Sequence, residues 1–109
     1  MERGEIWTSA SGRGYGSKPR PVVIIQHAGF QFLDSITFCG LTRDATDLPF
    51  FRILVEPSAE NGLEFPSRIM VDKILTTEKS KLGYRIGRLG TRDTARLNQA
   101  LLIFLGLVG

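Results

Sequence analysis

The sequence predicts a mainly β protein, built as a strongly bent antiparallel sheet or a small barrel, with one α-helix at its C-terminus. Short runs of β-branched and aromatic residues recur between turn-forming residues over most of the chain. One run, residues 22–25, is apolar at every position, which is typical of a central strand covered on both faces. Only the C-terminal segment has apolar residues at helical spacing. The length of 109 residues fits a single domain, 1–109.

Six short strands are expected in chain order. They cover residues 4–9, 20–26, 35–41, 50–55, 68–71 and 73–77. The third of these alternates polar and apolar residues, which predicts a half-buried strand. Residues 10–19 contain three glycines and one proline, so they are expected to form a loop between the first two strands.

The C-terminal helix is expected over residues 94–105. Asp93 can cap its N-terminus, and Gly106 can end it. Its apolar face is formed by Leu97, Leu101, Leu102 and Leu105, and is widened by Ile103 and Phe104. Many short strands followed by one terminal helix favour an SH3-like barrel or bent sheet.

Charge is distributed unevenly along the chain, which carries a net charge of +3 at pH 7. Residues 1–26 carry +2, residues 27–66 carry −4, and residues 67–109 carry +5. Two separated basic segments fit a polyanionic partner. On charge alone, an uneven surface without such a partner explains the pattern better, so the case for a polyanion needs other evidence.

The residue content excludes several kinds of site. Cys39 is the only cysteine, so no internal disulfide can form, and its apolar surroundings predict a buried thiol. His27 is the only histidine, which excludes two-histidine acid–base catalysis and a zinc site. The glycine-rich residues 12–16 lack the Lys-Ser/Thr pair of a Walker motif. Neither a cofactor nor a metal is therefore expected.

No segment of the sequence has the character of a membrane anchor. The longest apolar run, residues 100–108, is about half as long as a membrane-spanning helix requires. The first residues lack the apolar stretch of a signal peptide. The protein is therefore predicted to be cytoplasmic, without a membrane partner.

Arg20 and Thr42 are predicted to lie side by side at the rim of the sheet. If the second and third strands form an antiparallel hairpin, its turn centres near residue 31, and residue 20 then faces residue 42. Cross-strand neighbours approach within about 5 Å at Cβ, so a guanidinium and a hydroxyl could contact one phosphate. Pro19 and Pro21 flank the arginine and end strand pairing there. For an isolated arginine, a surface salt bridge would be the more usual role.

The sequence as a whole resembles the MazF/PemK/Kid family of toxins. The matching segments are Arg3-Gly4-Glu5-Ile6-Trp7, Arg20-Pro21-Val22-Val23-Ile24-Ile25-Gln26, Leu41-Thr42, Ser67-Arg68-Ile69-Met70-Val71-Asp72-Lys73-Ile74, Lys79-Ser80-Lys81-Leu82, Ile86-Gly87 and Leu105-Gly106-Leu107. No single segment is highly specific. Their order along nearly the whole chain carries the resemblance.

The resemblance implies a type II toxin that is a sequence-specific, metal-independent endoribonuclease. Such an enzyme cuts single-stranded RNA through attack of the 2′-hydroxyl on the neighbouring phosphate. The products have a 2′,3′-cyclic phosphate and a 5′-hydroxyl. The catalytic arginine and threonine of the family correspond to Arg20 and Thr42. Asp72 and Lys73 match positions that contact RNA bases.

The resemblance also implies two protein partners. One is a second copy of the chain, for which Ile103 and Phe104 offer apolar surface. The other is a cognate acidic, MazE-like antitoxin, because a freely active ribonuclease would stop protein synthesis in its own host. The basic segments at both ends of the chain would attract its acidic residues, as they would RNA.

Two places depart from the family pattern. Residues 15–18 (Tyr-Gly-Ser-Lys) contain no acid where relatives often carry one, so the role of a loop carboxylate as proton acceptor is in doubt. Met70 stands where the Kid branch has an arginine, which argues against Kid-type chemistry at that position. Tyr15 could stack on a base, and Lys18 and Arg43 could hold phosphates. Each of these three fits a solvated loop residue equally well.

Two other function classes remain open on the sequence alone. A CcdB-type toxin shares the fold and poisons DNA gyrase without being an enzyme, but it depends on a tryptophan near its C-terminus. This chain ends Gly106-Leu107-Val108-Gly109. A peptide-binding SH3-like module needs an exposed aromatic groove, whereas Trp7, the only tryptophan, lies in a predicted strand. An RNA cleavage assay separates the endoribonuclease from both of these classes.

Overall fold

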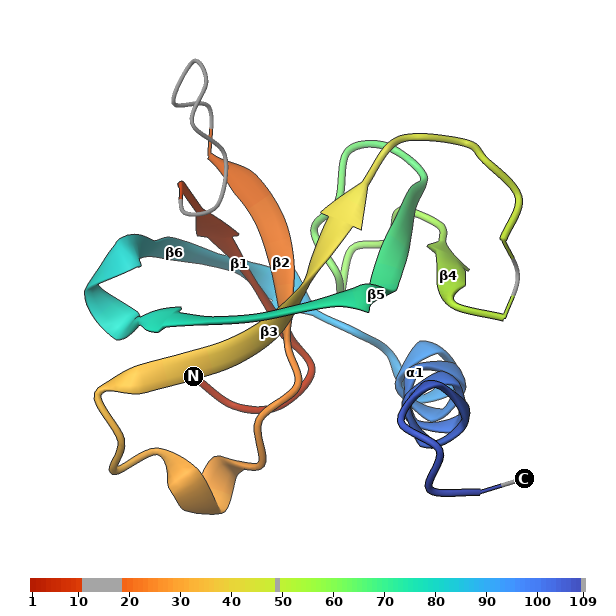
Figure 1. The fold of residues 1–109 in the computed structure, drawn as a ribbon. Helices are drawn as coiled ribbons and strands as arrows, with labels where there is room; N and C mark the ends of the chain where they lie inside the picture. Colours follow the sequence, from red (N-terminus) through yellow and green to blue (C-terminus); the bar gives the residue numbers. More distant parts are fainter. Residues whose placement is uncertain (11–18, 49, 109) are drawn as a thin grey trace.

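The computed structural model of the chain describes residues 1–10, 19–48 and 50–108, and these form a β-sheet with one C-terminal α-helix (Figure 1). The strands are β1 (Glu5–Ser9), β2 (Arg20–Ile24), β3 (Ser35–Thr42), β4 (Arg52–Val55), β5 (Ser67–Glu78) and β6 (Leu82–Arg88). The helices are the 3₁₀ turns η1 (Ala28–Phe30) and η2 (Lys79–Lys81) and the α-helix α1 (Thr91–Phe104). The predicted fold class is therefore confirmed.

The strands form one antiparallel sheet in the order β4-β5-β3-β2-β1-β6. The two edges are β4 and β6, so the sheet does not close into a barrel. Figure 1 shows β5 crossing the molecule, from β4 to the turn that leads into β6. Of the two predicted forms, the structure has the bent antiparallel sheet.

Both faces of the central strands are buried, as the unbroken apolar run in β2 predicts. Val23 belongs to a cluster that α1 covers, whereas its neighbours Val22 and Ile24 belong to a second cluster on the opposite face. The first cluster includes Ile6, Cys39, Leu41, Ile69, Val71, Leu97 and Leu101. The second includes Ile36, Phe38 and Leu82, with Trp7 packed against it.

A β-bulge makes β5 one long strand where two short strands, 68–71 and 73–77, were predicted. Leu41 of β3 pairs with Ile69, but Cys39, two residues earlier in β3, pairs with Ile74. Residues 70–73 therefore lie opposite Gly40 alone. Ile69 and Ile74 both contact the first cluster, so the bulge shifts the alternation of inward and outward side chains. This shift explains why the sequence suggested two strands.

The strand β6 was not predicted, because its sequence lacks a strand pattern. Residues 82–88 (Leu-Gly-Tyr-Arg-Ile-Gly-Arg) mix glycines and arginines with few apolar residues. As an edge strand, β6 pairs only with β1, and most of its side chains are at least partly exposed. Exposure on an edge removes the need for apolar alternation.

The helix α1 begins earlier than predicted. It starts at Thr91, with Gly90 at the N-cap, so Asp93 is not the capping residue. The Asp93 carboxylate instead lies in the first turn and accepts a hydrogen bond from Arg96 at 2.8 Å. The predicted end at Gly106 is confirmed: this residue has φ +72° and its N–H bonds back into the last turn.

Cys39 is buried in the first cluster, as predicted. Burial, together with the nearby Asp72 carboxylate, raises the pKa of the Cys39 thiol to about 12. The thiolate is therefore scarce near neutral pH. In the part of the chain that the structure describes, no helix has both the length and the apolar character needed to cross a membrane.

Candidate functional site

The candidate site depends on the register of the central strands. In the β2–β3 ladder, Val22 pairs with Gly40, and the same register holds through the rest of the ladder. The same register extended by two residues would put Arg20 across from Thr42, but the ladder ends at Val22 and Gly40, so this juxtaposition stays a prediction. Pro21 has no N–H to donate, which accounts for the end of the ladder before Arg20.

Residues on four adjacent strands form a row, here called the Arg20 row: Ser9 of β1, Arg20 of β2, Thr42 of β3 and Arg68 of β5. Ser9 pairs with Arg20, and Thr42 pairs with Arg68. Paired residues share one face of a sheet, and neighbouring strands lie about 4.8 Å apart. Thr42 therefore has Arg68 as its paired neighbour on β5, and the extended β2–β3 register predicts Arg20 on its other side.

The side chain of Arg20 is available for a ligand. It is exposed, and within the described residues its guanidinium makes no hydrogen bond or ion pair. Thr42 is half-buried, and its Oγ1 accepts a hydrogen bond from the Asp44 N–H at 3.1 Å. Because a hydroxyl both accepts and donates, the Thr42 O–H still has a proton to donate. The pair therefore presents a cation and a hydrogen-bond donor together.

A small cavity of about 90 Å³ opens beside Arg20. Its other lining residues include Gly40, Met70 and Lys73. A Cβ at Gly40 would lie only 2.8 Å from the Met70 methyl group, so the bulged part of β5 packs closely over this point. The bulge thus brings Lys73, an exposed cation, into the same cavity as Arg20.

Asp72 is held by an arginine that sequence reasoning did not identify. Arg52 donates two hydrogen bonds to the Asp72 carboxylate, at 2.8 and 3.0 Å. The two side chains are only 14% and 19% exposed, and the Lys73 ammonium lies 3.7 Å from the same carboxylate. The hydrogen bonds from Arg52 hold the pKa of Asp72 below its usual value. Arg52 was detectable as the one charge inside the apolar run 50–55, but its partner lies on another strand.

Replacing Asp72 with asparagine is expected to reduce stability at pH 7 by about 1–3 kcal/mol, because charge-assisted hydrogen bonds are lost. A carboxylate whose pKa is lower in the folded state contributes its full stabilisation at pH values above its unfolded-state pKa, which is about 3.9 for aspartate. This stabilisation disappears as pH falls through the folded-state pKa. Denaturant unfolding of both proteins should therefore give a larger difference in the free energy of unfolding at pH 7 than near pH 2. If the wild type and the Asp72→Asn variant differed equally in unfolding free energy at both pH values, this account would be contradicted.

The turn after β3 is fixed by local hydrogen bonds. The Asp44 carboxylate accepts from the Thr46 N–H at 2.9 Å and from the Thr46 hydroxyl at 2.7 Å. These bonds hold the pKa of Asp44 below its usual value. They also support the segment whose Asp44 N–H donates to the Thr42 hydroxyl, and so help to set the orientation of that hydroxyl.

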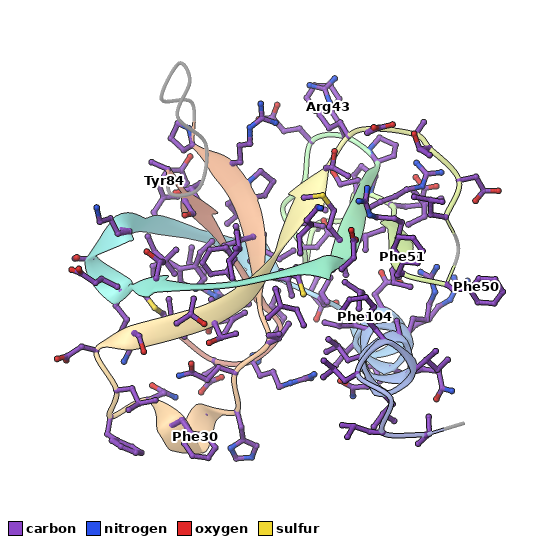
Figure 2. All side chains as sticks on the ribbon, in the orientation of Figure 1. Phe30, Arg43, Phe50, Phe51, Tyr84 and Phe104 are labelled. Atoms are coloured by element: carbon purple, nitrogen blue, oxygen red, sulfur yellow. The ribbon has the colours of Figure 1, made fainter. Side chains whose placement is uncertain are left out.

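Arg43 lies beyond the tip of β3, on the side of the molecule where β2 begins (Figure 2). Its guanidinium stacks over the Phe65 ring, 3.8 Å from the ring centroid. Both residues are exposed. A planar cation supported by an aromatic ring can contact a phosphate or stack on a base. The other two predicted RNA contacts, Tyr15 and Lys18, lie outside the described residues.

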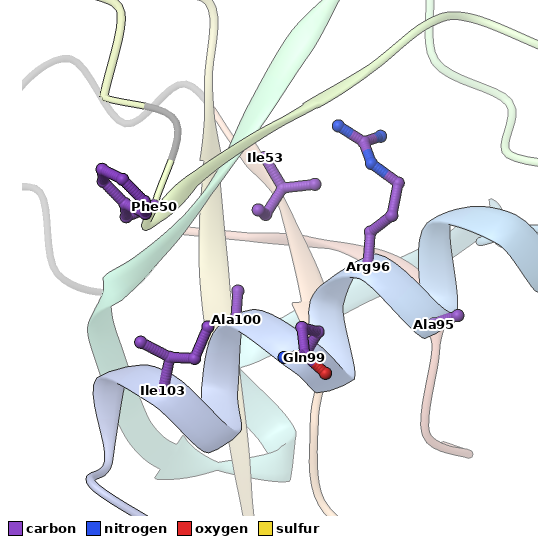
Figure 3. Close-up of a pocket in the computed structure, with 7 residues that line it drawn as sticks. All are labelled: Phe50, Ile53, Ala95, Arg96, Gln99, Ala100 and Ile103. Carbon is purple, nitrogen blue, oxygen red and sulfur yellow. The ribbon is translucent and has the colours of Figure 1, made fainter. Parts of the chain in front are cut away.

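A second, larger hollow of about 350 Å³ lies between β4 and α1 (Figure 3). Its lining is mainly apolar and includes Phe50, Ile53, Ala100 and Ile103. Arg96 borders it, but its guanidinium is occupied by the Leu54 carbonyl and the Asp93 carboxylate. Over the described residues, no three His, Cys, Asp or Glu side chains are grouped to hold a metal ion. The hollow is therefore suited to apolar contact, whereas the Arg20 row offers polar and charged groups.

Comparisons with known proteins point to one family. Residues 2–105 match the family described as "PemK-like, MazF-like toxin of type II toxin-antitoxin system". A protein of Mycolicibacterium smegmatis, "Probable endoribonuclease MazF", is 44% identical over 109 residues, covering 100% of both chains. Among solved structures, "Mycobacterium tuberculosis toxin MazF-mt6" superposes with a TM-score of 0.79 at 25% identity, covering 96% of this chain and 99% of that one. "Endoribonuclease in complex with its cognate antitoxin from Mycobacterial species" shares the fold, with a TM-score of 0.81 at 23% identity, covering 100% and 98% of the two chains.

Proposed function

Because this chain belongs to the PemK-like, MazF-like family of type II toxins, we propose that it is a sequence-specific endoribonuclease that cuts single-stranded RNA. Arg20 and Thr42 form its reaction centre. The observation that supports this assignment is the exposed guanidinium of Arg20, which makes no hydrogen bond or ion pair within the described residues. The β2–β3 register, extended past its last pair, would set it across from the Thr42 hydroxyl, which still has a proton to donate. Messenger RNA is the substrate, so the toxin acts in the cytoplasm and inhibits translation.

The reaction needs no nucleophile from the protein. The RNA 2′-oxygen attacks the adjacent phosphorus, an O2′–P bond forms, and the P–O5′ bond breaks. The 2′-hydroxyl loses its proton, and the departing 5′-oxygen gains one. Negative charge builds on the non-bridging oxygens of five-coordinate phosphorus. Arg20 stabilises this charge with two parallel hydrogen bonds, and Thr42 donates a third.

The remaining candidate residues hold the RNA around this centre. Lys73 contacts the strand from the cavity that it shares with Arg20. Asp72, oriented by Arg52, accepts hydrogen bonds from base edges. Arg43 contacts phosphate from its stacked position on Phe65. Tyr15 stacks on a base and Lys18 binds phosphate, as proposed from the sequence.

The active form is a homodimer that is controlled by an antitoxin. An exposed apolar patch continues from the end of α1 to the last described residue and supports self-association. It consists of Leu102, Ile103, Phe104, Leu105, Leu107 and Val108. The antitoxin is an acidic, MazE-like protein whose carboxylates compete with RNA for the basic residues near the Arg20 row.

Purified protein is expected to cut a long single-stranded RNA in the presence of EDTA, because Arg20 and not a metal ion stabilises the developing charge. Mapping the 5′ ends should reveal one short recurring sequence. Single-stranded DNA of the same sequence should stay intact, because it lacks the 2′-hydroxyl. Cleavage that requires added Mg²⁺, or no cleavage of any RNA, would refute the proposed function. A gyrase-poisoning toxin or a peptide-binding module would cut neither nucleic acid.

A further inference from the structure

The strand arginines of this protein fall into two groups. Arg52 is paired with Asp72, Arg85 with Glu5, and Arg88 with Glu2. Arg20 and Arg68 differ: within the described residues, neither guanidinium makes a hydrogen bond or ion pair. Arg68 pairs with Thr42 of β3, and Arg20 pairs with Ser9 of β1 at the start of β2.

The position of Arg68 follows from the part of β5 that precedes the bulge. There β5 pairs regularly with β3, as Leu41 faces Ile69 and Thr42 faces Arg68. The backbone of Arg68 is fixed by its pairing with β3 and β4. Its side chain is half-buried, so part of it still reaches solvent.

The acidic group that attracts Arg68, the Asp44 carboxylate, is not an ion-pair partner of its guanidinium. The Asp44 carboxylate is close enough for attraction, but it forms no ion pair with Arg68. Its Oδ1 already accepts two hydrogen bonds from Thr46. Arg68 is therefore a half-buried cation beside Thr42 that makes no hydrogen bond or ion pair within the described residues.

We propose that Arg68 forms a second phosphate subsite, which binds the phosphodiester next to the one that is cut. The ligand is the backbone of single-stranded RNA laid across the strands, with its scissile phosphate at Arg20 and Thr42 and the adjacent phosphate at Arg68. This inference rests on the proposed function. Such a contact carries no base specificity; it sets the register of the strand, so that the correct 2′-hydroxyl lies beside Arg20.

The subsite can be tested by binding, without cleavage. A short 2′-O-methyl RNA is the probe, because its blocked 2′-oxygen cannot attack. Its dissociation constant is measured by fluorescence anisotropy between about 50 and 200 mM salt. For Arg68→Gln, the slope of log Kd against log salt should fall by about 0.7, the value for one lost contact to a single strand. Arg68→Lys keeps the positive charge, so it should keep most of the slope. Arg92 is an exposed arginine on α1, and the control variant Arg92→Gln should have the slope of the wild type.

A cleavage experiment locates the contact on the RNA. With a short RNA that contains one mapped cut, Arg68→Gln should raise KM about tenfold and change kcat little, because a uniform binding contact is lost. A neutral methylphosphonate at the adjacent phosphate should raise the KM of the wild type similarly. The same methylphosphonate should not raise the KM of Arg68→Gln further, because the variant and the modified RNA both remove the same contact.

The possible outcomes separate this inference from the proposed function. An unchanged salt slope in Arg68→Gln would overturn the subsite, even if Arg20→Ala abolished cleavage. A loss in kcat with an unchanged slope would also overturn it, and would indicate that Arg68 acts by supporting the Asp44 turn. A wild-type protein that cuts no RNA would refute the nuclease, whereas the binding slopes would still test Arg68.

Discussion

Replacing Arg20 with alanine is expected to lower the rate of RNA cleavage at least about a hundredfold, the usual effect of removing one stabiliser of transition-state charge. The guanidinium is exposed and has no partner among the described residues, so its loss should leave the thermal midpoint nearly unchanged. Single-turnover cleavage of one mapped site, together with thermal unfolding of the same samples, measures both quantities. Thr42→Val should also reduce the rate, because it removes the hydroxyl while keeping the shape of the side chain.

Arg20→Lys is the matched variant for this test. It keeps the positive charge but cannot make two parallel hydrogen bonds to one phosphate, so it should recover only part of the lost rate. Arg92→Ala on α1 should cut at the wild-type rate. Near-wild-type cleavage by Arg20→Ala would show that the reaction centre lies elsewhere.

Replacing Gly62 with alanine is expected to destabilise the protein by about 3 kcal/mol, which combines the cost of a left-handed backbone with that of a steric clash. Gly62 has φ +70°, and an added Cβ would lie 2.4 Å from the Ile86 carbonyl oxygen of β6. The turn that holds Gly62 is fixed, because Gly62 donates its N–H to the Ser58 carbonyl and the neighbouring Asn61 is buried. The thermal midpoint should fall by about 12 °C or more.

Gly106→Ala separates the two costs. Gly106 has φ +72°, almost the same as Gly62, but nothing lies within 4 Å of an added Cβ. Alanine there should cost only the backbone term, about 1–2 kcal/mol. If both variants lost the same stability, the close approach between the 58–62 turn and β6 would not exist in solution.

Local features of the fold could be predicted from the sequence. The register of β2 and β3 follows from counting residues across one hairpin, and the pairing of Val22 with Gly40 confirms it. The end of α1 at Gly106 is equally local, because a left-handed residue closes the last turn. Both predictions depend on neighbouring residues in the chain.

Features that join distant segments could not be predicted. The bulge in β5 moves Lys73 into the cavity beside Arg20, but it exists only because β5 pairs with β3 and β4 together. The contact between Arg52 and Asp72 likewise crosses from β4 to β5. Arg68 was visible within a matching segment, yet its place on the Arg20 row requires the pairing of Thr42 with a strand far along the chain. Pairings of this kind depend on the whole fold and leave little trace in local patterns.

The central claim is that RNA supplies its own nucleophile at a phosphate held by Arg20 and Thr42. Mass spectrometry of the fragments released in EDTA tests it most directly, because the end groups record which oxygen attacked. We expect a 2′,3′-cyclic phosphate on one fragment and a 5′-hydroxyl on the other. Fragments with a 3′-hydroxyl and a 5′-phosphate would mean that water attacked the phosphate, and would contradict the proposed mechanism.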